Sequence, residues 1–315
     1  MEKSSKIYVA GHRGLVGSAL LRHLKNKGFN NLILKTHAEL DLTHQQSVDN
    51  FFSVQKPEYV FLSAAKVGGI YANDIYRADF IYQNLAIQLN VIEAARKYSV
   101  KRLLFLGSSC IYPRDCKQPM QETDLLSGYL EQTNEPYAIA KIAGIKMCEA
   151  YNKQYTTDFI SVMPTNLYGP HDNFDLQESH VLPALIRKIH TAKENNDASV
   201  CIWGTGNPRR EFLHVDDMAD ACLFVMQQKN DLDMVNIGSG QEVTIHALAE
   251  SICDVIGYQG FLVFDPGKPD GTPRKLLDST KINALGWHAK ISLTEGIAQT
   301  YNWFLQSEAC KSVAR

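Results

Sequence analysis

A glycine-rich turn near the start of the chain constrains the fold more than any other feature. The run Gly11-His12-Arg13-Gly14-Leu15-Val16-Gly17 directly follows the strand-like Ile7-Tyr8-Val9-Ala10, and apolar residues then recur at helical spacing as far as Leu24. Glycines so spaced permit a tight turn and let a pyrophosphate approach the backbone, while the following helix offers free N–H groups to the anion. The order Gly-x-x-Gly-x-x-Gly between a strand and an amphipathic helix therefore predicts a dinucleotide site.

Short apolar strands alternate with helices through the first half of the chain. We expect strands at about 6–10, 32–35, 59–64, 102–107 and 159–163, and long helices at about 80–97 and 136–155. Strands this apolar are buried on both faces, as in a parallel sheet covered by helices. The alternation predicts an α/β fold with a doubly wound, Rossmann-type parallel sheet.

The length predicts a second, smaller domain. The chain has 315 residues, and at roughly 150 residues per domain this suggests two. After Pro164 the rhythm changes to shorter elements separated by Pro- and Gly-rich loops. We expect a nucleotide-binding domain at 1–165, to which 211–238 returns, and an α/β substrate-binding domain at 166–315. Ser292 and Glu295 match a capping box that opens a last helix at about 293–307.

Composition excludes several classes of function. Lys and Arg total 32 against 34 Asp and Glu, so the chain lacks the basic field of a nucleic-acid binder. No apolar stretch approaches the ~20 residues of a membrane span, and no secretory core follows the N-terminus. The 7 cysteines are scattered without a Cys-x-x-Cys pair, which argues against disulfides and zinc and favours a cytoplasmic location. We expect no metal and no membrane partner.

The residues after the second strand favour NADP(H) over NAD. An NAD site often carries an acidic residue there that binds the ribose 2′-hydroxyl. This chain instead has Leu34-Lys35-Thr36-His37. Lys35, with His37 and with Arg13 of the glycine turn, can pair with a 2′-phosphate. The alternative is that Lys35 and His37 are solvated surface groups.

A tyrosine, a lysine and a serine form a candidate catalytic group. Tyr137 and Lys141 lie four residues apart on one face of a helix. A nearby ammonium lowers the pKa of a phenol, which then exchanges a proton with a substrate oxygen. Ser108 follows the fourth strand, at the sheet edge where doubly wound folds bind ligands, and can donate to the same oxygen. Without that context, all three residues would be ordinary surface groups.

These residues resemble the extended short-chain dehydrogenase/reductases, and longer runs are similar to the GDP-L-fucose synthase family within them. The resemblance covers essentially the whole chain. It rests on the runs 64–70, 107–113, 134–141, 164–174, 203–212 and 268–275. It implies 3,5-epimerisation and NADPH-dependent reduction of the C4 ketone of GDP-4-keto-6-deoxy-D-mannose.

The resemblance assigns an acid–base pair to Cys110 and His180. A C4 ketone acidifies the protons on C3 and C5, and inversion needs one group to remove a proton and another to return one to the opposite face. A thiol and an imidazole can both titrate near neutral pH. Ser108 and Tyr137 would stabilise the enolate, Tyr137 would protonate the reduced oxygen, and Lys141 would hold the nicotinamide ribose.

The resemblance also implies the binding residues. Cofactor contacts are expected, besides the glycine turn (Gly11, His12, Arg13, Gly14, Leu15, Val16, Gly17), at Lys35, Asp41, Leu42, Leu106, Gly107, Ser109, Lys141, Pro164, Thr165, Asn166, Leu167 and His180. Substrate contacts are expected at Asn166, Lys188, Trp203, Arg210, Asp270 and Lys275. The chain departs from the family pattern at His37 and Lys188, where we expect arginine; lysine keeps the charge but loses the bidentate fork.

Two other functions remain as alternatives. One is another nucleotide-sugar enzyme of the same architecture, such as a 4-epimerase or 4,6-dehydratase. A dehydratase would need a carboxyl acid–base pair where this chain has Ser108-Ser109-Cys110. The other is a non-catalytic dinucleotide sensor, which would have no use for a proton relay. The resemblance also suggests a homodimer packed through the helices at about 80–97 and 136–155.

Overall fold

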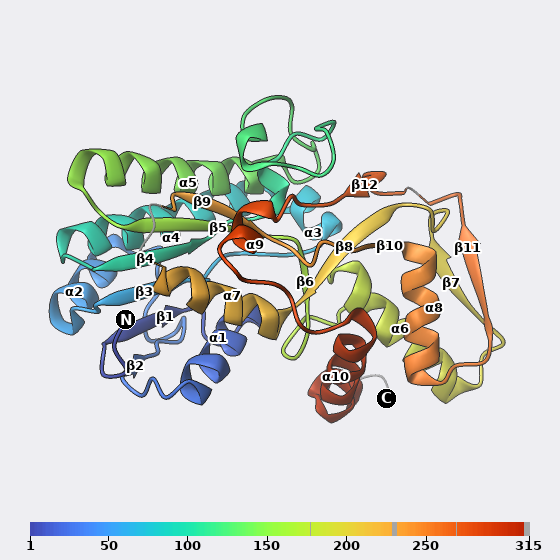
Figure 1. Ribbon diagram of the computed structural model, residues 1–315. Coiled ribbons are helices and arrows are strands. Elements are labelled where there is room, and N and C mark those ends of the chain that lie inside the picture. The colour runs from blue at the N-terminus through green and yellow to red at the C-terminus, as the bar shows by residue number, and fades with distance from the viewer. Residues whose placement is uncertain (177, 229–231, 269, 312–315) are drawn as a thin grey trace.

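A parallel sheet of six strands, covered by helices, is the larger of the sheets in this protein (Figure 1). The computed structural model describes residues 1–176, 178–228, 232–268 and 270–311. The strands lie in the order β2-β1-β3-β4-β5-β9. Their bounds are β1 Ile7–Ala10, β2 Leu32–Ile33, β3 Tyr59–Leu62, β4 Arg102–Leu106, β5 Phe159–Pro164 and β9 Met234–Ile237. Every pair in this sheet is parallel, as the buried apolar strands predict.

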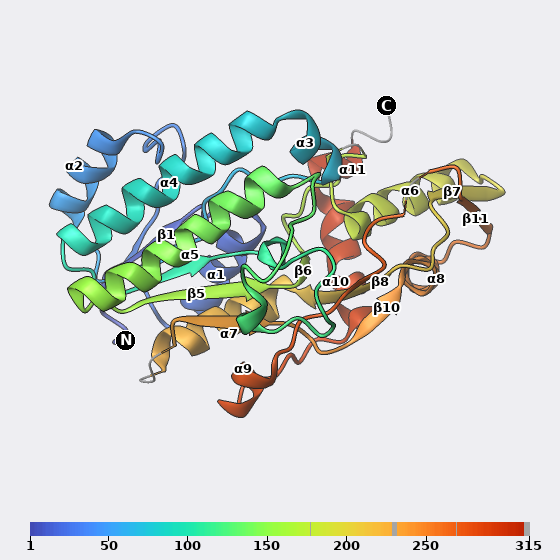
Figure 2. The same ribbon diagram turned by 90° about the horizontal axis from the view of Figure 1, so that it is seen from above.

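Helices cover both faces of the sheet. On one face lie α1 (Leu15–Asn26) and α7 (Val215–Gln227); on the other lie α2 (Gln45–Gln55), α4 (Arg77–Lys97) and α5 (Glu135–Tyr155), the last three side by side in Figure 2. In β1, Ile7 and Val9 pack into the core under the first pair, whereas Tyr8 and Ala10 pack into the core under the second group. Since successive strand residues point to opposite faces, this explains the unbroken apolar runs.

The chain reverses direction across the sheet between β1 and β3. From β1 it moves outward to β2 and then returns to the other side of β1. Doubly wound sheets bind ligands at such a switch point, outside the carboxyl ends of the strands. The second strand is shorter than expected and ends at Ile33, because β1 pairs with it only through Leu32 and Ile33. Lys35 therefore lies in a loop at this crevice.

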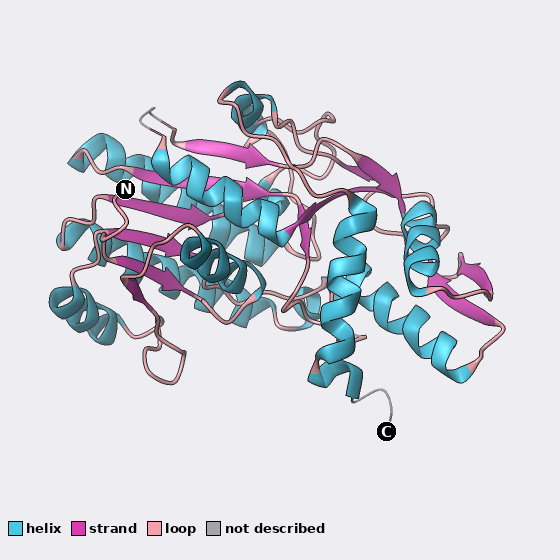
Figure 3. Ribbon diagram, turned by 60° about the horizontal axis from the view of Figure 1, so that its bottom comes forward, coloured by secondary structure: helices cyan, strands magenta, loops and turns pink. Residues whose placement is uncertain are grey.

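The later part of the chain forms smaller sheets around a third core. The sheets join β6 (Asn166–Tyr168), β8 (Arg209–His214), β10 (Glu242–Thr244) and β12 (Arg274–Lys275), and separately β7 (Ser199–Trp203) with β11 (Phe261–Asp265). The helices are α6 (Val181–Asn195), α8 (Ile245–Ile256) and α10 (Leu293–Gln306), seen at the right of Figure 3. The Ser292 hydroxyl accepts from Glu295 N–H at 3.3 Å, where the last helix was expected to begin.

Shorter elements complete the described chain: α3 (Ile70–Ile75), α9 (Thr280–Ala284), α11 (Glu308–Lys311) and the 3-10 turns η1 (Ser109–Ile111) and η2 (Glu122–Asp124). In the later part of the chain, β9 and α7 belong to the large sheet and its cover. Residues 229–231 of the expected return segment lie outside the described residues. The domain division at residue 165 stays a prediction. None of the helices described is long and apolar enough to cross a membrane.

Candidate active site

The glycine turn is packed too closely for side chains. Gly11 has φ +83°, and a Cβ there would lie 2.8 Å from Ala64 N, in the loop that follows β3. A Cβ on Gly17 would lie 2.0 Å from Gly11 O. Gly14 occupies the N-cap of α1, where no side chain caps the helix. The first N–H groups of α1 are therefore open to an anion, as a pyrophosphate requires.

A basic cavity adjoins this turn. It has a volume of about 450 Å³ and is lined by His12, Arg13, Ser18, Leu21, Arg22 and His171. His12 Nδ1 is buried without a hydrogen-bond partner among the described residues. Burial, and then the neighbouring Arg13, lower the pKa of His12. The unpaired nitrogen and the two arginines fit a phosphate-bearing cofactor at this end of the sheet.

The expected 2′-phosphate residues lie near the end of β2. Lys35 Nζ is 3.5 Å from Glu39 Oε1, so its charge is shared with a carboxylate. His37 is exposed, and its Nδ1 lies 3.9 Å from Asp41 Oδ1. Asp41 itself accepts hydrogen bonds from the N–H and hydroxyl of Thr43. Arg13 is exposed, and its side chain makes no hydrogen bond or ion pair with the described residues. Unlike Lys35, it therefore has a guanidinium that is not paired with a carboxylate.

Tyr137 and Lys141 project from α5 toward the end of β4. Lys141 is 3% exposed and donates to Leu106 O at 2.7 Å. Burial lowers the pKa of Lys141 to about 7, and the negative form of Cys110 opposes that shift. Burial also raises the pKa of Tyr137, with Cys110 adding to the rise and a hydrogen bond with Ser108 opposing it. The sequence predicted a lowered pKa for the phenol, but burial raises this pKa instead. The Lys141 Nζ lies 5.7 Å from the centre of the Tyr137 ring.

Ser108 and Cys110 share one short turn after β4. Ser108 is the N-cap of η1, and its hydroxyl accepts from Cys110 N–H at 3.2 Å. Cys110 Sγ receives two donors, Asn134 Nδ2 at 3.5 Å and Lys275 Nζ at 3.8 Å. The thiol, the hydroxyl and the phenol thus meet at the carboxyl edge of the sheet. The sulfur therefore faces polar groups rather than packed hydrocarbon, as an acid–base group requires.

His180 lies within electrostatic reach of Lys275, the residue that contacts the Cys110 sulfur. Burial, and then the Lys275 charge, lower the pKa of His180. His180 is the N-cap residue of α6 and is exposed to solvent, although neighbouring protein atoms crowd its ring. Among the described residues no direct hydrogen bond joins His180 to Cys110. The chain segment that bears His180 is held by Gly69, whose N–H donates to Glu178 O at 2.7 Å.

Gly69 leaves no room for a side chain. A Cβ there would lie 2.7 Å from Ser179 O and 2.9 Å from Glu178 O. The backbone of Gly69 is extended rather than left-handed, with φ −67°. Close approach to the segment before His180, and not backbone strain, therefore requires glycine at this position.

Of the expected substrate residues, Asp270 contacts the turn that follows Trp203. Asp270 accepts from Thr205 N–H at 2.9 Å and from its hydroxyl at 2.7 Å, and a Cβ on Gly204 (φ +82°) would lie 2.2 Å from the Asp270 carboxylate. Trp203 is 63% exposed, with the Lys188 and Lys268 ammonium groups each 5.4 Å from its ring centre. Pro269, between these segments, lies outside the described residues.

Arg210 and Lys275 are paired across neighbouring strands. Strand β12 runs parallel to β8 with Lys275 opposite Arg210. Burial lowers the pKa of Arg210, and Asp270 opposes that shift. Arg210 thus lies beside the strand position of Lys275 and within electrostatic reach of the Asp270 carboxylate. Lys275 contacts the Cys110 sulfur at 3.8 Å, and its expected contact with the diphosphate stays a prediction.

Glu211 is a residue that the sequence analysis missed. It is fully buried, and its carboxylate accepts from Gly240 N–H at 2.7 Å and Leu277 N–H at 3.1 Å. Its backbone carbonyl accepts from Asn166 Nδ2 at 2.7 Å and from the Thr165 hydroxyl at 3.2 Å. The Thr165 hydroxyl and the Asn166 amide nitrogen therefore donate to protein, and the expected ligand contacts of these two residues stay predictions.

The other expected cofactor residues line the strand ends. A Cβ on Gly107 would lie 2.4 Å from Met163 Sδ, and Leu106 contributes its carbonyl to Lys141. Leu42 is buried and its carbonyl accepts from Asn90 at 2.9 Å. Ser109 is buried too, as is Val16, whereas Leu15 is partly exposed. Pro164 ends β5, and Leu167 lies in β6.

Asn134, which contacts the Cys110 sulfur, was not among the expected site residues, although its spacing from Tyr137 indicates the same site. It lies three residues before Tyr137, one turn along the same helix face, within a run that the sequence analysis used only for its resemblance.

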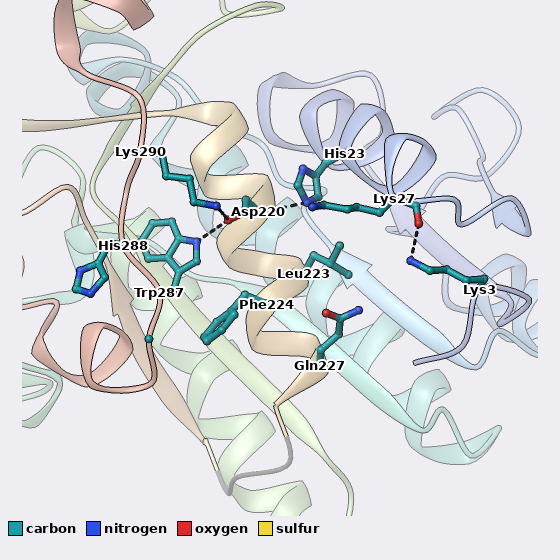
Figure 4. A pocket seen from close by; sticks show the side chains of 11 residues that line it. Lys3, His23, Lys27, Asp220, Leu223, Phe224, Gln227, Trp287, His288 and Lys290 are labelled. Carbon is teal, nitrogen blue, oxygen red and sulfur yellow. Dashed lines mark hydrogen bonds and ion pairs between the residues drawn. The ribbon is translucent and has the colours of Figure 1, made fainter.

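A second cavity lies on a different face of the molecule. It has a volume of about 310 Å³ and lies between α1, α7 and the segment 286–290 (Figure 4). Asp220 accepts from Trp287 Nε1 at 2.9 Å and Lys290 Nζ at 3.2 Å, and Lys3 and Lys27 stand at the rim. None of the expected site residues lines it. Its ion pairs tie the later chain to the large sheet's cover.

Known proteins match both the sequence and this arrangement. The model of the NAD dependent epimerase/dehydratase family matches residues 7–238. The chain is 62% identical over 307 residues to a putative GDP-L-fucose synthase 2 of Arabidopsis thaliana, covering 98% of this chain and 94% of that protein. It is 55% identical over 312 residues to a GDP-L-fucose synthase of Escherichia coli K12, covering 96% and 97%.

A solved structure agrees in fold. A GDP-L-fucose synthetase from Naegleria fowleri, bound to NADP, superposes with a TM-score of 0.91 at 27% identity, over 98% of this chain and 96% of that one. The family model, the near-complete coverage and the shared architecture lead to one conclusion. The chain belongs to the NAD dependent epimerase/dehydratase family and, within it, to the GDP-L-fucose synthases.

Proposed function

We propose that this protein converts GDP-4-keto-6-deoxy-D-mannose to GDP-L-fucose, by inverting C3 and C5 and then reducing the C4 ketone with NADPH. The observation that carries the proposal is the meeting of Cys110 with the Tyr137–Lys141 pair. Cys110 shares the turn after β4 with Ser108, whose hydroxyl accepts from Cys110 N–H at 3.2 Å, and Lys141 donates to Leu106 O at the end of the same strand. A thiol beside a reductase-type tyrosine is what a combined epimerase and reductase needs, because both steps use the same polarised carbonyl.

The cofactor site consists of the glycine turn, the N-terminus of α1 and the neighbouring cations. Gly11, Gly14 and Gly17 leave backbone N–H groups for the pyrophosphate, and Arg13 is free for a 2′-phosphate. NADPH, when bound, supplies the hydride that reduces C4. Lys141, held by Leu106 O, orients the nicotinamide ribose and lies beside Tyr137.

The chain's own groups handle the protons. Cys110 removes a proton from C3 or C5, and His180 returns one from the opposite face. Ser108 and Tyr137 donate to the C4 oxygen while it carries the enolate charge, and Tyr137 later gives its proton to the reduced oxygen. Arg210 and Lys188 bind the diphosphate, with Trp203 along the pocket wall and Asp270 accepting hydrogen bonds from the sugar nucleotide.

Product analysis tests the reaction directly. Purified protein is incubated with GDP-4-keto-6-deoxy-D-mannose and NADPH, and the product is identified by NMR. The proposal requires GDP-L-fucose, with NADPH consumed faster than NADH. A C4-reduced product with unchanged C3 and C5, or a 4-epimer, would instead support another nucleotide-sugar activity of the same architecture.

Replacing Cys110 with serine separates the two steps. We expect Cys110→Ser to lower solvent deuterium incorporation at C3 and C5 by at least about 100-fold, because a hydroxyl is a far weaker base than a thiolate. Incorporation is measured by NMR without NADPH, so that reduction does not intervene. Unchanged incorporation would remove Cys110 from the mechanism.

We also propose a cytoplasmic homodimer. Large apolar side chains are exposed along α4 and α5, including Tyr82 (68% exposed), Leu89 (50%) and Ile139 (43%). Two copies packed through these neighbouring helices would cover that surface. Sedimentation should give twice the chain mass, and Leu89→Asp should shift the protein toward monomer. All seven cysteines are free thiols, as in a reducing compartment.

A further inference from the structure

Two donors outside the expected acid–base pair converge on the Cys110 sulfur. Asn134 approaches from the residue before α5, and Lys275 from β12, more than 100 residues later in the chain. Each places a nitrogen within hydrogen-bond distance of Sγ, at 3.5 Å and 3.8 Å. A sulfur that faces two N–H donors, one of them cationic, is in surroundings that stabilise a thiolate.

The side chain of Asn134 does not stabilise the start of the helix that follows it. Asparagine at an N-cap normally accepts an N–H of the first helical turn. Asn134 occupies the N-cap of α5, yet its side chain makes no capping hydrogen bond. Its Oδ1 is buried without a partner among the described residues, while Nδ2 donates to Cys110. Rotation of the amide would present Oδ1 to an S–H group, so this one side chain can serve both the thiolate and the thiol.

Lys275 is directed to the acid–base pair by the strands that carry it. Its pairing opposite Arg210 and the hydrogen bond from Leu277 N–H to Glu211 hold β12 against β8. Its charge also lowers the pKa of His180, after the larger effect of burial. A cation here stabilises negative sulfur and weakens the hold of His180 on a proton. The first effect favours a thiolate base, and the second makes the protonated form of His180 a stronger acid.

We infer that Lys275 and Asn134 are catalytic residues of the epimerisation, which hold Cys110 as the thiolate that removes the carbon-bound proton. This inference rests on the proposed function. As the S–H bond forms, the C–H bond breaks and its electron pair moves to the C4 oxygen, giving an enolate. His180 then gives a proton to the opposite face of the same carbon, and the C4 carbonyl re-forms. The exchange is redox-neutral.

The charged and titratable groups around the sulfur are few in the described chain. Lys275 faces it from β12, Tyr137 and Lys141 from α5, and His180 lies beyond Lys275. Lys275 is therefore the cation whose removal most directly changes the thiolate, because Lys141 is committed to Leu106 O.

Alkylation of Cys110 tests this without any substrate. The full-length protein is treated with iodoacetamide over a range of pH, and each cysteine peptide is followed by mass spectrometry, with exposed Cys201 as the internal reference. We expect Lys275→Met to slow Cys110 alkylation at pH 7 by at least about tenfold. Lys275→Arg should restore most of the rate. Lys268→Met, which removes another cation beside Trp203, should leave the alkylation rate within about twofold.

Replacing Asn134 with aspartate separates catalysis from helix capping. Aspartate is as good an N-cap as asparagine, so a capping role would leave Asn134→Asp like the wild type. A thiolate-stabilising role predicts slower alkylation of Cys110 and slower deuterium exchange at C3 and C5, because the carboxylate repels negative sulfur. Wild-type alkylation rates in both Lys275→Met and Asn134→Asp would overturn the inference.

The same variants distinguish failure of the inference from failure of the proposed function. Slower alkylation with normal deuterium exchange would mean that the two donors hold the thiolate but that epimerisation does not depend on it, which overturns their catalytic assignment. If the wild-type protein exchanges no deuterium at all, the proposed function fails. The alkylation profiles would then still decide whether Lys275 and Asn134 stabilise the sulfur.

Discussion

The large sheet and the later, smaller sheets are built on opposite principles. Every residue of β1 and of β5 is buried, whereas β7 alternates between exposed and buried positions and ends on the exposed Trp203. A doubly covered sheet holds its strand ends still, which suits groups that react. An open sheet keeps polar and aromatic side chains accessible, which suits groups that bind. Ser108, Cys110, Tyr137 and Lys141 come from the first region, and most of the expected substrate residues come from the second.

The largest test of this contrast is a change in the first region that affects chemistry alone. We expect Tyr137→Phe to slow ketone reduction by about 10²–10⁴-fold, because the phenol is the proton donor. NADPH affinity, measured by fluorescence titration, should stay within about threefold. A normal rate of NADPH oxidation in this variant would show that the proton comes from elsewhere.

A change in the second region should act mainly on binding. We expect Arg210→Gln to raise KM for the nucleotide sugar by about tenfold or more, because a charge-assisted contact to phosphate is lost. The kcat should change much less. Steady-state kinetics at saturating NADPH separates the two constants. A kcat loss as large as that of Tyr137→Phe would break the division of labour between the regions.

The junction between the regions offers a smaller effect. Gly69→Ala adds a methyl group against the backbone before His180, so we expect deuterium exchange at C3 and C5 to fall several-fold as that segment moves. Reduction of a substrate analogue that needs no epimerisation should change little. Gly267→Ala is the matched control, since its Cβ would meet only the flexible Asp265 side chain, at 3.1 Å. Equal losses in both variants would mean that the position of His180 does not depend on Gly69.

The smallest effects are opposite pH slopes in stability. The pKa of Lys141 is about 7 in the folded protein. Between about pH 7 and 10.5 the folded protein therefore binds fewer protons at Lys141 than the unfolded chain does. Because of this difference, Lys141 makes the free energy of unfolding rise with pH across that window. Asp172 has its pKa raised to about 7 by burial, and its Oδ2 has no partner in the described structure. It binds more protons when folded between about pH 4 and 7, so its contribution to stability is lost as pH rises through that range.

Lys141→Met and Asp172→Asn should each remove one slope. Urea unfolding at a series of pH values, compared with the wild type, measures the difference as a change of order a few kcal/mol across each window. If the difference from the wild type had the same sign in both variants, the burial of one or both groups would be contradicted.

Sequence patterns predicted the large sheet well and the substrate side less well. The strands and the two long helices of the first region begin and end within a few residues of their expected positions, because burial on both faces leaves an unbroken apolar run. The expected strand 32–35 keeps only Leu32 and Ile33, the two residues that pair with β1. The amide of Asn166 donates to Glu211 O, a contact across strands that no local pattern contains.

The sequence by itself determined the phosphate-binding turn, the parallel sheet and the chemical types gathered at its edge, because these depend on local spacing and on which residues avoid water. The tertiary structure alone decided which groups surround the Cys110 sulfur. Asn134 and Lys275 meet there because α5 and β12, distant in the chain, are brought to one strand end by packing and by the buried Glu211. Distances between such segments depend on the balance of all their contacts, and spacing along the chain carries no record of them.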